Sequence, residues 1–219
     1  MEKEIVFVKN QEELDAIPLD FEGIIKIKDA TEKIIISNLY KNPVMIYHDC
    51  KVKTMNDACV VAWNNADIFA DGCSVVVAFD EAKVIADFES KVLAYGNVFV
   101  EVRDSAEAIA HHSSFVTAKD LTNVTVYDNV SCVAYGMSSV IAYDHANVEA
   151  HDMADITAFG EASVEAYDRV KVSACLDATV QMHHFEITDV EFFESQNDDK
   201  NKEDDEELKK VIKWVLDYK

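Results

Sequence analysis

An eight-residue repeat that keeps its phase through most of the chain limits the fold more than any other feature. Each unit has the form V-x-A-x-(D/G)-x-(A/S)-x, and Val or Ile fills the first position in 16 of 18 successive units. Those first positions are Val44, Val52, Val60, Ile68, Val76, Val84, Val92, Val100, Ala108, Val116, Val124, Cys132, Val140, Val148, Ile156, Val164, Val172 and Val180. One such unit cannot bury its own apolar side chains, so the repeat indicates a stacked solenoid.

The spacing within one unit predicts a short strand followed by a corner. The Val and the Ala two residues later have the period of two that puts both side chains on one face of a strand, and Val is β-branched. The position four residues after the Val is mostly Asp or Gly, which tolerate the left-handed backbone of a tight corner. Four of the five glycines occupy it: Gly72, Gly96, Gly136 and Gly160.

The number of units in one coil follows from comparing the corner residues. When every third unit is compared, Asp80, Asp104, Asp128 and Asp152 fall into one column. This favours an all-β fold, a single-stranded parallel β-helix with three sides and about 24 residues per coil, with strands about 4.8 Å apart. A flattened two-sided roll with two units per coil is the alternative.

Four segments are expected along the chain. Residues 1–43 have looser spacing and predict an N-terminal cap, with a strand at 5–8, a short helix at 11–16 and strands near 24–27 and 33–37. Residues 44–185 form the octapeptide-repeat β-helix. Residues 186–205 are acidic and polar, as in a flexible linker. Residues 206–219 predict an amphipathic C-terminal α-helix.

Residues that follow the inward Val point outward, and several are apolar. With three units per coil, one outer face carries Val61, Ile85, Ile109 and Val133, with Trp63, Tyr135 and Phe159 nearby. An exposed apolar stripe of this length usually marks a contact surface. The C-terminal helix, with Leu208, Val211, Ile212, Trp214 and Val215, or a second copy of the chain is expected to cover it, which makes a homodimer one expected state.

The corner aspartates suggest an acidic ladder of Asp80, Asp104, Asp128 and Asp152. Neighbouring carboxylates one strand spacing apart repel by about 1 kcal/mol in bulk water. Calcium bound to the carboxylates, or corner N–H groups donating to them, would offset this repulsion, and we favour the second because the Gly-rich turn of calcium-binding rolls is absent. The histidines lack metal-ligand spacing, so neither a metal nor another cofactor is expected.

Charge and composition exclude several partners. Asp and Glu number 42 against 20 Lys and Arg, a formal charge of −22, so direct binding to nucleic acid or to an anionic membrane is not expected. No apolar run is long enough to span a bilayer, and the first residues do not resemble a signal peptide. Five cysteines without a CxxC pair indicate a reduced, cytoplasmic protein.

The sequence lacks the phosphate-binding loops and nucleophile motifs of common enzymes, so we do not expect an enzyme. A rigid acidic β-helix is able to occupy the nucleic-acid groove of another protein, and we expect a binding protein that engages such a partner by charge mimicry. Two alternatives stay open. One is a structural or assembly module of a phage particle. The other is a carbohydrate-active enzyme that uses Arg103 with Asp104 or Lys119 with Asp120.

The runs SSVIAYDHANVEAHD and ASVEAYDRVKV resemble the octapeptide arrays (SVxAYDxAxV) of gut bacteria and their phages. The opening KNQEELDAIPLDFEGIIKIKD is similar to the leader that such arrays often carry. The resemblance covers roughly residues 1–184. It implies a β-helix and a phage or mobile-element setting, and it implies no catalytic residues.

Overall fold

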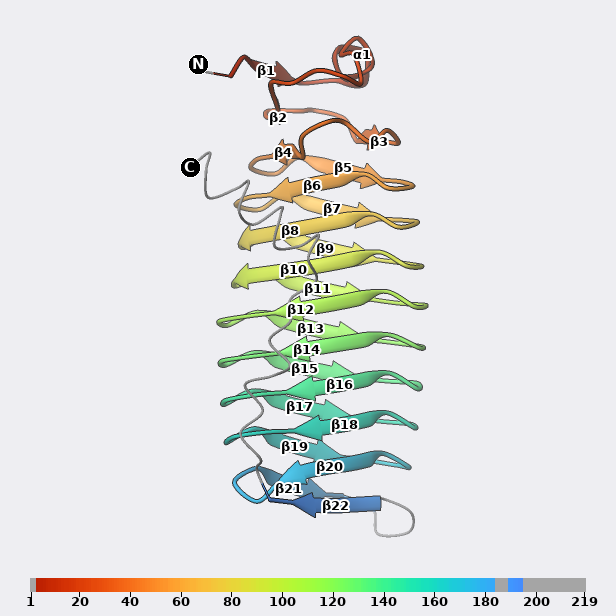
Figure 1. The fold of residues 1–219 in the computed structure, drawn as a ribbon, viewed down its shortest axis with the longest axis vertical. Helices are drawn as coiled ribbons and strands as arrows, with labels where there is room; N and C mark the ends of the chain where they lie inside the picture. The colour runs from red at the N-terminus through yellow and green to blue at the C-terminus, as the bar shows by residue number, and fades with distance from the viewer. Residues whose placement is uncertain (1–2, 184–188, 195–219) are drawn as a thin grey trace.

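The chain winds into a long two-sided β-solenoid in which parallel strands alternate between two sheets (Figure 1). The computed structural model describes residues 3–183 and 189–194. Sheet A runs along one side of the solenoid and sheet B along the other. The first two strands, β1 and β2, both belong to sheet A, and from β2 onward the chain crosses to the other sheet after each strand. The parallel β-helix predicted from the sequence is therefore confirmed as a parallel, stacked, all-β solenoid.

Within the described residues, sheet A has twelve strands in the order β1-β2-β4-β6-β8-β10-β12-β14-β16-β18-β20-β22. Their bounds are β1 (Ile5–Val8), β2 (Ile24–Ile27), β4 (Val44–Ile46), β6 (Cys59–Ala62), β8 (Val75–Asp80), β10 (Lys91–Gly96), β12 (Glu107–Ala110), β14 (Asn123–Val126), β16 (Ser139–Ala142), β18 (Asp155–Ala158), β20 (Lys171–Cys175) and β22 (Asp189–Phe193).

In the same part of the chain, sheet B has ten strands in the order β21-β19-β17-β15-β13-β11-β9-β7-β5-β3. Their bounds are β3 (Ile34–Ile36), β5 (Lys51–Thr54), β7 (Asp67–Ala70), β9 (Lys83–Ala86), β11 (Phe99–Val102), β13 (Phe115–Ala118), β15 (Ser131–Ala134), β17 (Asn147–Ala150), β19 (Ser163–Ala166) and β21 (Thr179–Met182). The described part of the chain has one helix, α1 (Gln11–Asp15), which Asn10 caps by accepting from the N–H of Glu13.

Two octapeptide units close each coil, and the prediction of a three-sided coil built from three units is wrong. Val60 pairs with Val76 in sheet A, and Val84 pairs with Val100 in sheet B. Each of these partners lies two units further along the chain. The inward pattern repeats with every unit and is compatible with two sides or three, so it does not select the coil size.

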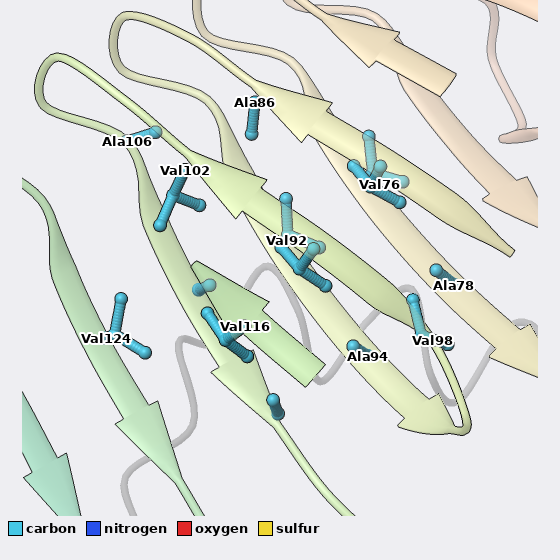
Figure 2. Close-up of a cluster of buried hydrophobic side chains, with 14 of the residues drawn as sticks. Val76, Ala78, Ala86, Val92, Ala94, Val98, Val102, Ala106, Val116 and Val124 are labelled. Carbon is cyan, nitrogen blue, oxygen red and sulfur yellow. The ribbon is translucent and has the colours of Figure 1, made fainter. Parts of the chain in front are cut away.

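The core is a thin layer between the two sheets. Val76, Val92 and Val124 point into it from sheet A, and Val102 and Val116 point into it from sheet B (Figure 2). The Val and Ala positions predicted to face inward are buried along both sheets. Small side chains in both rows let the two sheets approach closely, which suits a flat coil with two strands.

The corners recur at every eighth residue from 48 to 168, and all sixteen have a positive φ. Gly96 has the largest φ, +103°, where a side chain would be strained. A corner also needs space for the neighbouring coil. At Gly72 a Cβ would lie 2.9 Å from the backbone nitrogen of Asn56 in the preceding coil.

The ends differ from the predicted segments in one respect. Within residues 1–43 the structure has β1, α1, β2 and β3, close to the predicted ranges. The range 186–205, expected to be a linker, contains β22, because Val190 and Phe192 continue sheet A by pairing with Val172 and Ala174 of β20. The expected helix at 206–219 lies outside the described residues.

Candidate interaction surfaces

Four side chains on the outer face of sheet A are buried although they point away from the core. They lie in consecutive coils at the middle position of their strands: Met45, Val61, Val77 and Leu93. The last three are completely inaccessible to solvent and form an apolar cluster of their own, separate from the core between the sheets. We call these four residues the sheet A patch.

The equivalent row on sheet B is different in burial and in chemistry. Phe69, Ile85 and Glu101 occupy the middle outward positions of β7, β9 and β11, and all three are only partly buried. The two outer faces of the solenoid are therefore not equivalent, and burial on the outside is concentrated on sheet A between β4 and β10.

A column of stacked aromatic rings runs beside the patch along the edge of sheet A. Its members stand two units apart: Trp63, Phe79, Tyr95, His111, Tyr127, Tyr143 and Phe159. Neighbouring ring centroids lie 4.3–5.6 Å apart with planes within 16° of parallel. In-register parallel strands place these rings at the stacking distance, and each pair adds about 0.5–1.5 kcal/mol beyond burial.

A shorter column lies on sheet B. Tyr135, His151, Tyr167 and His183 stack with centroids 5.0, 4.8 and 4.3 Å apart. Glu149 flanks this column, with its carboxylate 2.8 Å from Nε2 of His151. The column begins four coils later than that of sheet A, so the two columns overlap only between Tyr135 and Phe159.

All seven corner aspartates make the same backbone hydrogen bond. In each, Oδ2 accepts from the N–H of the corner residue 16 positions earlier, at 2.8–3.4 Å. The seven are Asp80, Asp104, Asp120, Asp128, Asp144, Asp152 and Asp168. A hydrogen bond to a charged group contributes about 1.5–3 kcal/mol, which exceeds the repulsion of about 1 kcal/mol between neighbouring carboxylates in bulk water. The corner N–H explanation of the aspartates is therefore confirmed.

The acidic ladder of Asp80, Asp104, Asp128 and Asp152 is wrong as a single column. Because corners alternate between the two edges of the flat coil, Asp80 and Asp128 lie on one edge and Asp104 and Asp152 on the other. We name each edge after the sheet whose strands end at its corners. The sheet A edge carries Asp80, Asp128 and Asp144, and the sheet B edge carries Asp104, Asp120, Asp152 and Asp168.

A cluster of ion pairs occupies the middle of sheet B. Oε1 of Glu101 lies 2.9 Å from Nε of Arg103 and 2.6 Å from Nζ of Lys119. The hydrogen bond from Arg103 holds the pKa of Glu101 below its usual range. Burial raises the pKa of Asp87, although Arg103 lies 3.9 Å away and opposes the rise. The two basic residues named for the carbohydrate-enzyme alternative are thus engaged with carboxylates of their own face.

The predicted apolar face divides between the two sheets. Val61 and Ile109 lie on sheet A, whereas Ile85 and Val133 lie on sheet B, because three units correspond to one and a half coils. Trp63 and Phe159 belong to the aromatic column of sheet A, and Tyr135 belongs to that of sheet B. The predicted helix residues Leu208, Val211, Ile212, Trp214 and Val215 lie outside the described residues.

Sequence reasoning missed Phe79, His111 and Tyr127 as members of one surface. A comparison of outward positions in every second unit finds them directly, because the position just before alternate corners is Trp, Phe, Tyr, His, Tyr, Tyr and Phe in succession. A comparison of every third unit hides them, because it mixes this column with residues of the opposite sheet.

A groove of about 730 Å³ borders the sheet A patch. The loop between β3 and β4 forms one wall, and the first outward positions of successive sheet A strands, Cys59, Val75, Lys91 and Glu107, line its length. Asp57 and Glu89 add two further carboxylates to the lining. Lys41 and Lys91 also line it, so the groove is a mostly apolar channel with three carboxylates and two lysines, beside the apolar patch.

The described residues contain no group of His, Cys, Asp or Glu arranged to hold a metal ion. No helix in the described part of the chain is long and apolar enough to cross a membrane. No disulfide joins the five cysteines, and burial raises the pKa of the Cys132 thiol to about 12. Comparison of the chain with protein-family models, curated proteins and solved structures finds no match in any of the three.

Proposed function

We propose that this protein is a non-enzymatic, cytoplasmic binding protein whose corner carboxylates engage the basic surface of a protein that itself binds nucleic acid. In this function the solenoid acts as a charge mimic that competes with nucleic acid for its partner. The resemblance to octapeptide arrays of gut bacteria and their phages suggests an inhibitor carried by a phage or mobile element.

One observation carries the proposal: the carboxylates are held in place by the backbone. Each corner aspartate is anchored through Oδ2 to the preceding coil, so partner binding would cost little additional side-chain order. Asp104 and Asp120 occupy consecutive coils, about 4.8 Å apart, which is comparable with one phosphate per ~3.4 Å along a strand of B-DNA. The formal charge of −22 would attract a basic partner over a distance.

The test replaces all seven corner aspartates with asparagine in the full chain. Asparagine keeps an oxygen for the corner N–H and tolerates the left-handed backbone, so the variant removes charge and retains the corner geometry. The probe is the set of bacterial proteins that bind a duplex DNA column. We expect the immobilised wild type to retain a member of this set at low salt and the asparagine variant to lose it.

The competition experiment decides between mimicry and other binding. Duplex DNA added to the wild-type column should release the retained protein, because both ligands would occupy one basic site. Equal retention by both columns, or retention that duplex DNA does not affect, would overturn the proposal. Circular dichroism and the melting temperature of the asparagine variant establish that it is folded.

A second candidate is a module that assembles with copies of itself, as a dimer or within a phage particle. It is favoured by a stripe on the sheet B edge, where Leu121, Met137 and Met153 occupy consecutive coils and are each more than half exposed. Light scattering over a range of concentrations tests it. Met137→Lys should reduce any self-association, whereas Asn129→Lys, at the same place after the opposite corner, should not.

A further inference from the structure

The burial of the sheet A patch requires a cover that its own sheet does not supply. The partly buried apolar residues packed against Val61, Val77 and Leu93 are Trp63, Val75, Phe79, Tyr95 and Ile109, all on the same face of sheet A. Ile109 and Ile141 occupy the same outward row beside the same aromatic column and keep part of their surface exposed. Neighbours within the sheet therefore do not account for the complete burial of Val61, Val77 and Leu93.

The C-terminal residues start from the same sheet. Phe193, at the end of β22, pairs with Cys175, and its ring contacts Phe159 at the end of the aromatic column. Six strand spacings of about 4.8 Å, or ~29 Å, separate β22 from β10, and eight, or ~38 Å, separate it from β6. The twelve residues 194–205 span up to about 40 Å when extended, so residues 206–219 are able to reach the patch.

The chemistry of these last residues matches the patch and the groove beside it. As a helix, residues 206–219 would be about 21 Å long, with Leu208, Val211, Ile212 and Val215 on one side. The patch spans three strand spacings, or ~14 Å. Lys209, Lys210 and Lys213 flank the apolar side. The adjacent groove is lined by Asp57, Glu89 and Glu107, of which Glu107 pairs with Lys91 at 3.6 Å, and by Lys41.

We propose that residues 206–219 form an amphipathic helix that docks within the same molecule on the sheet A patch, covering Met45, Val61, Val77 and Leu93. The docked helix closes the apolar half of sheet A, which leaves the acidic edges and sheet B as the accessible surfaces. This inference is independent of the proposed partner, because it concerns only the chain itself.

The experiment uses Trp214 as a reporter. The chain has two tryptophans, so Trp63→Phe, which keeps an aromatic ring in the column, leaves Trp214 as the single emitter in the full-length protein. Because Trp214 lies at the border of the apolar side, next to Val211, we expect docking to shield it partly from acrylamide and to shift its emission to the blue. Val77→Lys places a charge beneath the docked helix and should increase the undocked population by about tenfold or more, a change equivalent to about 1.4 kcal/mol or more.

Ile85→Lys is the matched control, because Ile85 occupies the same middle outward position on the neighbouring strand β9 of sheet B. It should leave Trp214 shielded. If Val77→Lys perturbs the solenoid itself, Ile212→Lys makes the complementary change outside it. That variant should expose Trp214 and increase the binding of an apolar dye, with the β-sheet circular dichroism unchanged.

Two results would overturn the proposal. Trp214 that is as accessible in the native protein as in denaturant would mean that residues 206–219 do not dock. Shielding that disappears on dilution, together with twice the monomer mass in light scattering, would mean that a second copy covers the patch. Shielding that is independent of concentration in a monomer supports docking within one molecule.

Discussion

At the scale of single residues, the corner is the position where chemistry is most restricted. Every eighth residue has a positive φ, and Asp, Asn, Gly and His fill fifteen of the sixteen corners from 48 to 168. Asp also supplies an acceptor for the N–H of the corner residue one coil earlier in the chain. The exception is Phe88, whose ring is more than half exposed and whose φ is +58°.

Phe88 is therefore expected to cost stability. A bulky residue in the left-handed region is unfavourable by roughly 1–2 kcal/mol, and Phe88 brings no acceptor to the corner of Gly72. Phe88→Asn should raise the free energy of unfolding by about 1 kcal/mol, measured by denaturant titration. Phe88→Leu keeps the strain and lacks the acceptor, so a gain as large as that of Asn would contradict this explanation.

At the scale of elements, each strand divides its side chains between a dry interior and an outer surface. The sequence pattern was sufficient to assign the inward positions, because the period of two is strict and the interior accepts only small apolar residues. The pattern was not sufficient to tell which strands belong to the same sheet, because that depends on the number of units in one coil. Asp and Gly meet the same requirement at both edges, so comparing corners carries little information about the number of sides.

Strand β14 offers a direct test of the inward assignment. Val124 points into the core, and its neighbour Thr125 points outward. Val124→Asp buries an unpaired charge between the sheets and should destabilise the solenoid by several kcal/mol, about 3 or more. Thr125→Asp should change stability by less than about 1 kcal/mol. Thermal melts of the two variants compare them, and equal melting temperatures would contradict the assignment.

At the scale of the whole molecule, the candidate surfaces depend on the coil length. Trp63, Phe79 and Tyr95 form a column only because two units bring the chain back to the same edge. Their aromatic character is readable in the sequence, but their alignment is not, until the coil length is known. The burial of Val61 and Leu93 could not be read at all, since alternation alone predicts an exposed position for both.

The coil also predicts which deletions the fold tolerates. Removing residues 124–139 joins Asn123 to Val140, which takes the place of Val124 in the same register. This variant should remain folded and shorten by about 4.8 Å, measured by small-angle scattering. Removing residues 124–135 instead brings Gly136 to the inward Val position and should prevent folding. A stable product of the second deletion would contradict the in-register coil.

The parallel pairing of every strand has one more consequence, which concerns the ends. Each corner carboxylate binds back to the coil before it, and no described pair of strands is antiparallel. The solenoid therefore has a direction, and its N-terminal and C-terminal ends are chemically different. Two molecules that meet with the C-terminal end of one against the N-terminal end of the other could continue the same parallel strand pairing. Two N-terminal ends could not. A partner that binds along the long axis of the solenoid will therefore bind in one direction in preference to the other.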